Sequence, residues 1–139
     1  MVKLLFSHKI HQGLLHFWLL LSRVVLSAFM FTHGLPKLQR LLNGNFEGFP
    51  DPLGIGSTYS LILTVVGEIV SPILVAAGLA TRLSSVPVII AMGVAAFMVH
   101  ATDPFQRKEL ALMYLVGFIA ILILGGGKYS FDAVLNKRR

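Results

Sequence analysis

Hydrophobic residues along the chain gather in four long runs, separated by short polar or turn-forming stretches. The runs cover about residues 14–34, 59–79, 83–100 and 110–126. A helix needs about 20 apolar residues to cross the hydrocarbon core of a bilayer, and each run comes close to that length. The pattern therefore predicts an all-α polytopic membrane protein, in which residues 1–139 form a single domain built as a bundle of four transmembrane helices.

The segment between the first and second runs, residues 35–58, is the longest stretch outside the predicted spans. It carries Phe46 and Phe49 among glycines and prolines, which favour turns. The two aromatic rings indicate a segment that dips to the membrane interface. A short re-entrant loop or a surface turn fits the same pattern equally well.

The composition favours lipid over water as the surroundings of the helices. Of the 139 residues, 55% are hydrophobic and 13% are charged, whereas about a quarter of the residues of a soluble domain are charged. Because so few residues are charged, much of the apolar surface has to face lipid. The chain has no cysteine, which excludes disulfides, thiol redox chemistry, Fe–S clusters and cysteine-based zinc sites.

The net charge of +6 is interpreted as a signal for orientation in the membrane. No basic stripe with interleaved aromatic residues is present in the sequence, so no nucleic-acid partner is expected. With four spans, seven cations fall on one side and four on the other, and the positive-inside rule then places both termini in the cytoplasm. We expect the first run to be a retained span, not a cleaved signal peptide. The seven are Lys3, Lys9, Arg82, Lys128, Lys137, Arg138 and Arg139, and the four are Lys37, Arg40, Arg107 and Lys108.

Two ionisable residues interrupt the first and second runs, Arg23 and Glu68. Ionisable groups inside a span usually face the bundle interior and mark a site, because lipid disfavours charge. At 1.5 Å per residue, Arg23 lies about 16 Å and Glu68 about 12 Å below the same membrane boundary. The sequence therefore predicts that the two charges neutralise each other in mid-membrane, either within a functional site or as a purely architectural ion pair.

Other polar residues extend this sector along both helices. In the second run Ser60, Thr64, Glu68 and Ser71 recur at helical spacing and form one stripe. Pro72 lacks an N–H, so the carbonyl of Glu68 loses its helical partner and a kink is expected there. The residues that share a face on the first run are Arg23, Ser27 and Gly34.

A second cluster of polar residues is expected nearer the outer boundary. His33 ends the first run, His100 ends the third, Glu109 opens the fourth, and Lys37 lies just beyond the first. Two histidines and a carboxylate can hold a divalent metal, relay protons or hydrogen-bond a quinone carbonyl. No short motif fixes metal-ligand spacing, so no metal is predicted. The plainer interpretation is that both histidines are interfacial side chains that reach toward water.

The order of these residues is typical of a known family. Arg23 is followed by Phe31-Thr32-His33-Gly34 and Lys37, then by Glu68, Gly78-Leu79-Ala80-Thr81-Arg82, His100, Glu109 and Gly125-Gly126-Gly127-Lys128-Tyr129-Ser130-Phe131-Asp132. In this order and spacing the chain resembles the DoxX family of small four-helix membrane proteins, from about Leu21 to Leu135. The family commonly has proline where this chain has Gly126, which weakens the stiff turn there.

The resemblance implies a bacterial inner membrane and, for some members, a role as the membrane subunit in thiosulfate:quinone oxidoreduction. Other members are tied to membrane complexes that handle oxidative stress or thiol balance. The functional residues of the family correspond here to Arg23, Glu68, Arg82 and His100.

We therefore expect a membrane subunit of a quinone-linked redox or oxidative-stress complex, with a quinone or a similar lipophilic redox molecule bound within the bundle. Glu68 would exchange the proton under the control of Arg23, and His33 or His100 would bond a quinone oxygen. The sequence has no haem motif and no nucleotide loop, so a soluble or membrane protein partner is expected to complete any reaction. Whether the chain is itself an enzyme stays open. The alternatives are a structural anchor for a partner and a small-solute carrier, although no inverted repeat is visible.

Overall fold

The computed structural model describes residues 10–137, and its described part contains helices and no strand. Two of the helical segments, η1 and η2, are single π-helical turns within longer helices. The elements in chain order are α2 (Gln12–Leu42), α3 (Ser57–Val65), η1 (Val66–Val70), α4 (Ser71–Ala77), α5 (Thr81–Val94), η2 (Ala95–Val99), α6 (Phe105–Leu124) and α7 (Phe131–Asn136).

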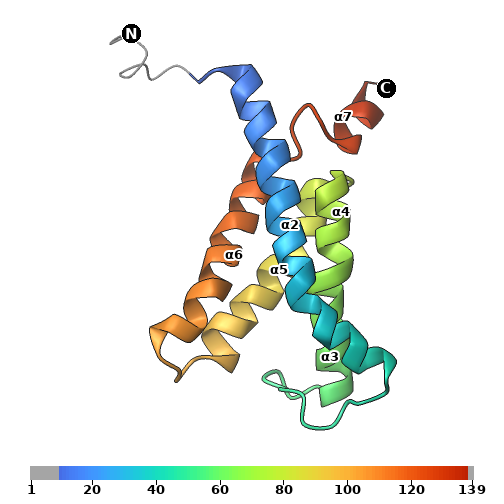
Figure 1. The fold of residues 1–139 in the computed structure, drawn as a ribbon, viewed down its shortest axis with the longest axis vertical. Coiled ribbons are helices and arrows are strands. Elements are labelled where there is room, and N and C mark those ends of the chain that lie inside the picture. Colours follow the sequence, from blue (N-terminus) through green and yellow to red (C-terminus); the bar gives the residue numbers. More distant parts are fainter. Residues whose placement is uncertain (1–9, 138–139) are drawn as a thin grey trace.

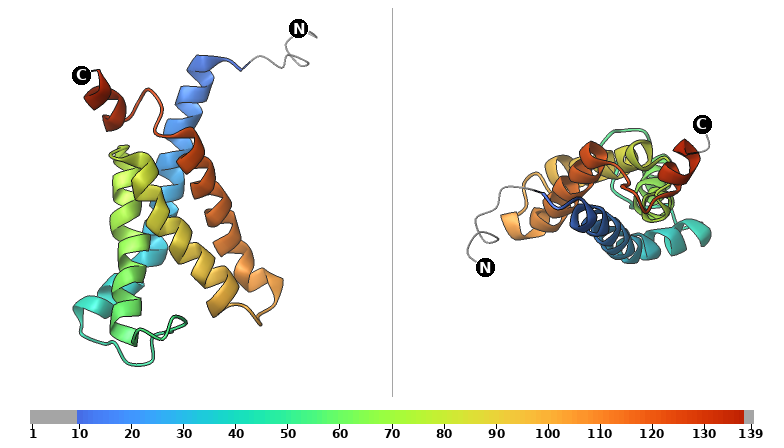
Figure 2. Two further views of the ribbon diagram at one scale, coloured as in Figure 1. Left: turned by 180° about the vertical axis from the view of Figure 1, so that it is seen from behind. Right: turned by 90° about the horizontal axis from the view of Figure 1, so that it is seen from above.

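The helices run alternately in opposite directions (Figure 1). The segments α3, η1 and α4 form one 21-residue helix, Ser57–Ala77, and α5 with η2 forms a 19-residue helix, Thr81–Val99. The start of α2 and the short α7 lie at one end of the molecule, here called the α7 end. The α2–α3 loop and the α5–α6 connection lie at the opposite end, here called the loop end. Toward the loop end, α5 and α6 diverge from α3 (Figures 1 and 2).

Three of these helices are long and apolar enough to cross a membrane: Gln12–Leu42, Ser57–Ala77 and Thr81–Val99. Between 22% and 50% of their most apolar windows is buried inside the chain, so much of the apolar surface is left for lipid. The 20-residue α6 carries Arg107, Lys108 and Glu109 near its start. The chain is thus an all-helical membrane protein with three candidate spans, and α6 has a charged beginning.

Helix α2 is longer than the sequence predicted. Its apolar run was expected to end at Gly34, but the helix continues through Pro36 to Leu42. Leu38 and Leu41 pack against a buried cluster on α3, which supports the helix beyond the proline. Tertiary packing therefore overrides the two residues that usually end helices. As a result Lys37 belongs to a helix and not to a loop.

Two apolar clusters hold the bundle together. The larger one joins α2, α4, α5 and α6 around Met30, Val75, Val88 and Phe118, each with no exposed surface. The smaller one lies toward the loop end and is built on Leu61, Val65 and Ile69; the partly buried residues packed on it are Phe31, Leu38, Leu41, Phe46 and Phe49. Phe46 and Phe49 therefore fold back onto the bundle, and the guanidinium of Arg40 lies 5.6 Å from the Phe49 ring centre.

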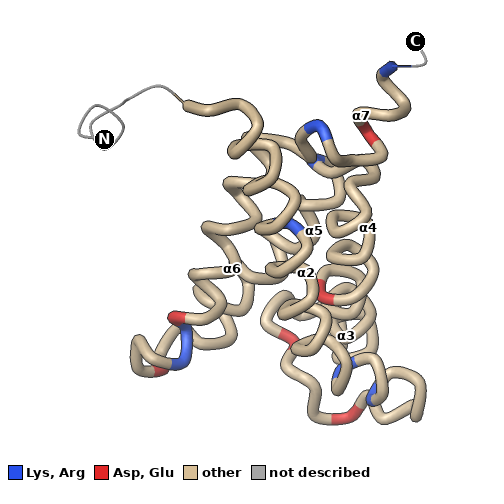
Figure 3. Tube along the Cα trace, turned by 45° about the horizontal axis from the view of Figure 1, so that its top comes forward, with Lys and Arg blue, Asp and Glu red and all other residues tan. Residues whose placement is uncertain are grey.

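Charged residues of the described part lie mostly toward the two ends of the helix bundle, with few between them (Figure 3). Lys37 and Arg107 line one cavity at the loop end, whereas Arg82 lines a groove with the C-terminal segment at the α7 end. Each of these three cations lies at the end of the bundle expected for it from the sequence, whereas which end faces the cytoplasm stays a prediction. Of the cations used for that expectation, Lys3, Lys9, Arg138 and Arg139 lie outside the described residues.

Candidate functional site

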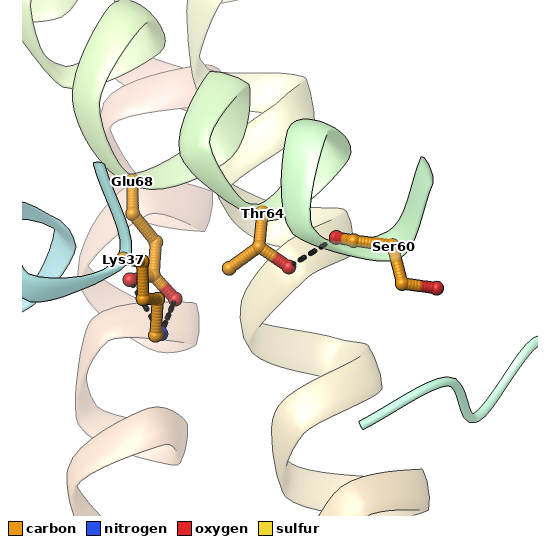
Figure 4. Close-up of polar contacts among 4 residues, drawn as sticks. All are labelled: Lys37, Ser60, Thr64 and Glu68. Atoms are coloured by element: carbon orange, nitrogen blue, oxygen red, sulfur yellow. Dashed lines mark hydrogen bonds and ion pairs between the residues drawn. The ribbon is translucent and has the colours of Figure 1, made fainter. Parts of the chain in front are cut away.

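Glu68 forms an ion pair with Lys37 in the interior of the bundle (Figure 4). The Glu68 side chain is 3% exposed, and both of its carboxylate oxygens accept hydrogen bonds from Lys37 Nζ, the one to Oε2 at 2.6 Å. Lys37 is 34% exposed, so the pair reaches from the buried carboxylate toward open space. A buried charge with a bonded partner of opposite sign is far less unfavourable than one alone.

The predicted pair between Arg23 and Glu68 is wrong. Arg23 is 2% exposed, and its Nη1 and Nη2 donate to the carbonyls of Gly126 (2.8 Å) and Tyr129 (2.6 Å). The reason is side-chain direction, since side chains tilt toward the N-terminus of their own helix. Arg23 on α2 therefore points toward the α7 end, whereas Glu68 on the antiparallel helix points toward the loop end. Lys37, placed farther along α2, tilts back toward Glu68.

A π-helical turn surrounds Glu68. It covers Val66–Val70, and the N–H of Ser71 bonds the carbonyl of Val66, five residues back. Pro72 follows directly, so this turn stands where the sequence predicted a kink at a carbonyl without its helical partner. Gly34 of α2 faces the same turn, because a Cβ on Gly34 would lie 2.9 Å from the Glu68 carbonyl oxygen. The missing side chain lets α2 approach the backbone that carries the carboxylate.

Two hydroxyls of the predicted polar stripe, those of Ser60 and Thr64, form local hydrogen bonds, of which Figure 4 shows the one between these two residues. Ser60, Glu68 and Ser71 are buried and Thr64 is partly buried, which agrees with one polar face. Thr64 Oγ1 donates to the carbonyl of Ser60 (2.7 Å), and Ser60 Oγ donates to Asp51 (2.7 Å). The bond between Ser60 and Asp51 thus fastens the start of α3 to the preceding loop.

Four of the predicted site residues meet at one half-open cavity of about 210 Å³: His33, Lys37, Glu68 and His100. The cavity lies toward the loop end, where α5 and α6 diverge from α3. The His33 ring stands edge-on to the Tyr114 ring, with centroids 5.8 Å apart and planes at 80°. The residues that complete the lining are Met30, Met92, Ala95, Arg107, Leu110, Ala111 and Tyr114.

Three polar side chains are linked beside this cavity, those of His100, Asp103 and Arg107. His100 Nδ1 lies 2.7 Å from Asp103 Oδ2, and Arg107 lies 3.7 Å from the same oxygen. The hydrogen bond with His100 is the main reason that the pKa of Asp103 lies below its usual range. Because Asp103 occupies Nδ1, the other ring nitrogen of His100 remains for a ligand.

The other predicted site residues lie elsewhere. Glu109 is exposed and does not line the cavity. Arg82 is exposed at the α7 end, where its Nη2 donates to the carbonyl of Ile123 (3.2 Å). Among residues 10–137, no group of three or more His, Asp or Glu side chains is placed to hold a metal ion. Tyr114 and Arg107 also line the cavity but were not predicted from the sequence, although their spacing of seven places them on one helical face.

At the α7 end, Arg23 and Asp132 organise a second polar cluster, here called the Arg23 knot and defined as Arg23, Thr81, Gly126, Tyr129 and Asp132. Asp132 accepts hydrogen bonds from the N–H groups of Ala80 (2.7 Å) and Thr81 (2.8 Å) and from Thr81 Oγ1 (2.7 Å). Burial alone would raise the pKa of Asp132, but these bonds and the charge of Arg23 hold it below its usual range. The knot ties the segment after α6 to α2 and α5.

Glycines make this close packing possible. A Cβ on Gly126 would meet Thr81 Oγ1 and Ser130 at 2.6–2.7 Å, and one on Gly78 would collide with the Arg23 guanidinium. Gly126, which stands where the resemblance leads one to expect proline, therefore leaves room for its neighbours. The Nε of Arg23 and the hydroxyl of Ser27 are buried without a partner among the described residues.

Comparisons with known proteins agree with the membrane architecture. The model of the DoxX family matches residues 18–101, which include Arg23, Lys37, Glu68 and His100. The chain is also 28% identical over 126 residues to an uncharacterized protein of Haemophilus influenzae, covering 86% of this chain and 83% of that protein. No solved structure matches the chain.

Proposed function

The chain belongs to the DoxX family of membrane proteins, and from this premise we propose that it is a four-span subunit of a quinone-linked redox complex in a bacterial inner membrane. The fourth span would be α6, whose apolar part, residues 110–124, is about 22 Å long at 1.5 Å per residue. With four spans both ends of the chain lie on one side, and the positive-inside rule makes that side the cytoplasm.

The observation that carries the proposal is the cavity beside the Glu68–Lys37 pair. Its volume of about 210 Å³ is below the roughly 300 Å³ at which pockets for drug-sized ligands begin. It therefore suits a quinone ring whose tail stays outside in the lipid. His33 and Tyr114 can donate hydrogen bonds to the ring carbonyls. The Nε2 of a neutral His100, whose Nδ1–H bonds Asp103, can accept a hydrogen bond from a quinol hydroxyl. The methionines offer an apolar wall.

The pair gives the site a means of handling protons. Reduction of a quinone to a quinol takes up two electrons and two protons. Glu68, as a carboxylic acid, can give one of these protons to the ring, and Lys37 compensates the charge that is left behind. The second proton would come from water at the open side of the cavity. A chain without cysteine holds no Fe–S cluster, so the electrons would come from a protein partner.

The test is the lipid-soluble content of the purified protein. Wild type, Glu68→Gln and Lys37→Gln would be purified in mild detergent, extracted with organic solvent and examined for quinone by mass spectrometry. Glu109→Gln is the matched control, because Glu109 is an exposed carboxylate that does not line the cavity. We expect near-stoichiometric quinone in wild type and in the control, and loss in both cavity variants.

Bulk lipid alone in all four samples would overturn the quinone proposal and favour a structural anchor or a solute carrier. Quinone retained equally in all samples would show binding away from the cavity.

A further inference from the structure

The short helix α7 has two chemically different faces. Phe131, Val134 and Leu135 follow the i, i+3, i+4 pattern of one helical face and are 60%, 50% and 53% exposed. Asp132 and Asn136 lie on the other face by the same helical spacing. An exposed apolar face of this kind needs an apolar surrounding.

The orientation of α7 is set by bonds, so the exposed face is a fixed feature of the fold. Asp132 takes three hydrogen bonds from Ala80 and Thr81 through its carboxylate, and its backbone N–H donates to the carbonyl of Gly78 (3.0 Å). Ser130 caps the helix by accepting from the N–H of Ala133 (3.2 Å). These contacts hold the polar face of α7 against the start of α5.

The apolar face of α7 continues into the lipid-facing surface of the bundle. The groove beside α7 is lined by Leu135 together with Leu83 of α5 and Leu124 of α6. Leu83 is 73% exposed and Leu124 is 52% exposed, and both belong to ends of the long apolar helices. Because Leu135 shares the groove with these two leucines, a bilayer that covers them would also lie next to Leu135.

The level of α7 along the bundle is that of a membrane interface. The N–H of Lys128, just before α7, lies 3.3 Å from His16 Nδ1 on α2. Trp18, two residues farther along α2, is 61% exposed, and tryptophan is enriched at the headgroup level of membranes. Tyr129 and Phe131, both more than half exposed, add aromatic rings at the same end.

We propose that α7 is an interfacial anchor, with Phe131, Val134 and Leu135 inserted at the boundary of headgroups and acyl chains. The leaflet it enters is the one at the α7 end. Lys128 and Lys137 flank the helix, and the sequence continues with Arg138 and Arg139. This basic flank complements anionic phospholipids, which bind amphipathic segments more strongly than neutral ones do. The partner surface is thus an anionic bilayer, and the inference does not depend on quinone binding.

Tryptophan fluorescence of the full chain tests the insertion of α7. The chain has one tryptophan, Trp18, so Trp18→Phe gives a silent background. Into it Phe131→Trp, Leu135→Trp or Asn136→Trp would be introduced. Asn136 is the matched control, because it lies on the polar face of α7. The proteins would be reconstituted in vesicles of phosphatidylcholine with phosphatidylglycerol that contain lipids brominated near the headgroup or near the chain end.

We expect blue-shifted emission for Phe131→Trp and Leu135→Trp, with quenching by lipids brominated near the headgroup at least about twofold stronger than for Asn136→Trp. Replacing phosphatidylglycerol by neutral lipid should weaken this quenching.

Two results would overturn the proposal. Tryptophan emission typical of a water-exposed side chain at both positions would show that the face lies outside the bilayer. Blue-shifted emission that no brominated lipid quenches would show that protein, a second copy or another chain, covers the face. Far-ultraviolet circular dichroism of each variant would exclude misfolding as the cause.

Discussion

At the scale of single residues, the most consequential contact is between Glu68 and Lys37, because it gives a buried carboxylate a partner of opposite charge. Glu68 is almost fully buried, whereas about a third of the Lys37 side chain is exposed. Removing one partner of a fully buried pair costs about 3–5 kcal/mol, and exposure reduces that cost through solvent screening.

We therefore expect Lys37→Met to lower the free energy of unfolding by about 1–2 kcal/mol, since it leaves a buried carboxylate without its cation. The double variant Lys37→Met with Glu68→Gln should recover most of that loss. Denaturant unfolding of the purified protein in detergent would measure both, as a double-mutant cycle. A cycle between Arg23→Gln and Glu68→Gln is the control and should show no coupling; coupling there instead would restore the pair predicted from the sequence.

Residues of the candidate site could be picked out from the sequence, but their partners could not. Glu68 and Arg23 stand out because each interrupts an apolar run, and His33, Lys37 and His100 because they lie at run ends. The pairing failed because helix periodicity gives the face of a residue and not the direction in which its side chain leans. In antiparallel helices two residues at similar depth can lean apart, as Arg23 and Glu68 do.

At the scale of elements, the approach of α2 to the π-helical turn controls where Glu68 sits. Gly34 allows this approach, because an added Cβ would lie 2.6 Å from the Ile69 side chain and 2.9 Å from the Glu68 carbonyl oxygen. The side chain of Ile69 can turn away, whereas the backbone oxygen cannot move without shifting the turn that carries the carboxylate.

Gly34→Ala should therefore lower the free energy of unfolding by about 1–3 kcal/mol through overpacking. Gly93→Ala is the matched control, since Gly93 is also helical and a Cβ there meets no described atom within 4 Å. It should be neutral or stabilise by up to about 1 kcal/mol, the difference in helix propensity. Unfolding in detergent would measure both, and equal effects of the two substitutions would contradict the close approach at Gly34.

The helices could be predicted from the sequence where a long apolar run, as a membrane span requires, marks them. The second and third runs, 59–79 and 83–100, lie within two residues of Ser57–Ala77 and Thr81–Val99 at each end. The extension of α2 past Pro36 was not predictable from local pattern, because it depends on packing against α3, which comes later in the chain. The π-helical turns depend on how neighbouring helices fit, which periodicity does not encode.

At the scale of the whole molecule, the two ends of the bundle serve different purposes. At the loop end the helices diverge and leave the cavity, whereas at the α7 end the Arg23 knot ties the C-terminal segment to α2 and α5. The knot joins Thr81 with Gly126 and Asp132, parts of two motifs about 45 residues apart in the sequence. Both motifs belong to the pattern on which the resemblance in the sequence rests, but their meeting around Arg23 could not be predicted from it.

The knot should open in acid because its central carboxylate has a lowered pKa in the folded protein. A carboxyl group of this kind stabilises the fold fully above its unfolded pKa, near 3.8 for Asp132. That stabilisation is lost as the pH falls through the lower folded pKa. Wild type should therefore lose stability below about pH 4, and Asp132→Asn should lose less over the same range.

Thermal unfolding in detergent between pH 2 and pH 6 would measure the difference. Asp51 and Asp103 also have lowered pKa values, but both remain in the variant, so the difference between the two profiles isolates Asp132. Parallel profiles would mean that the hydrogen bonds to Asp132, and not its charge opposite Arg23, hold the C-terminal segment in place.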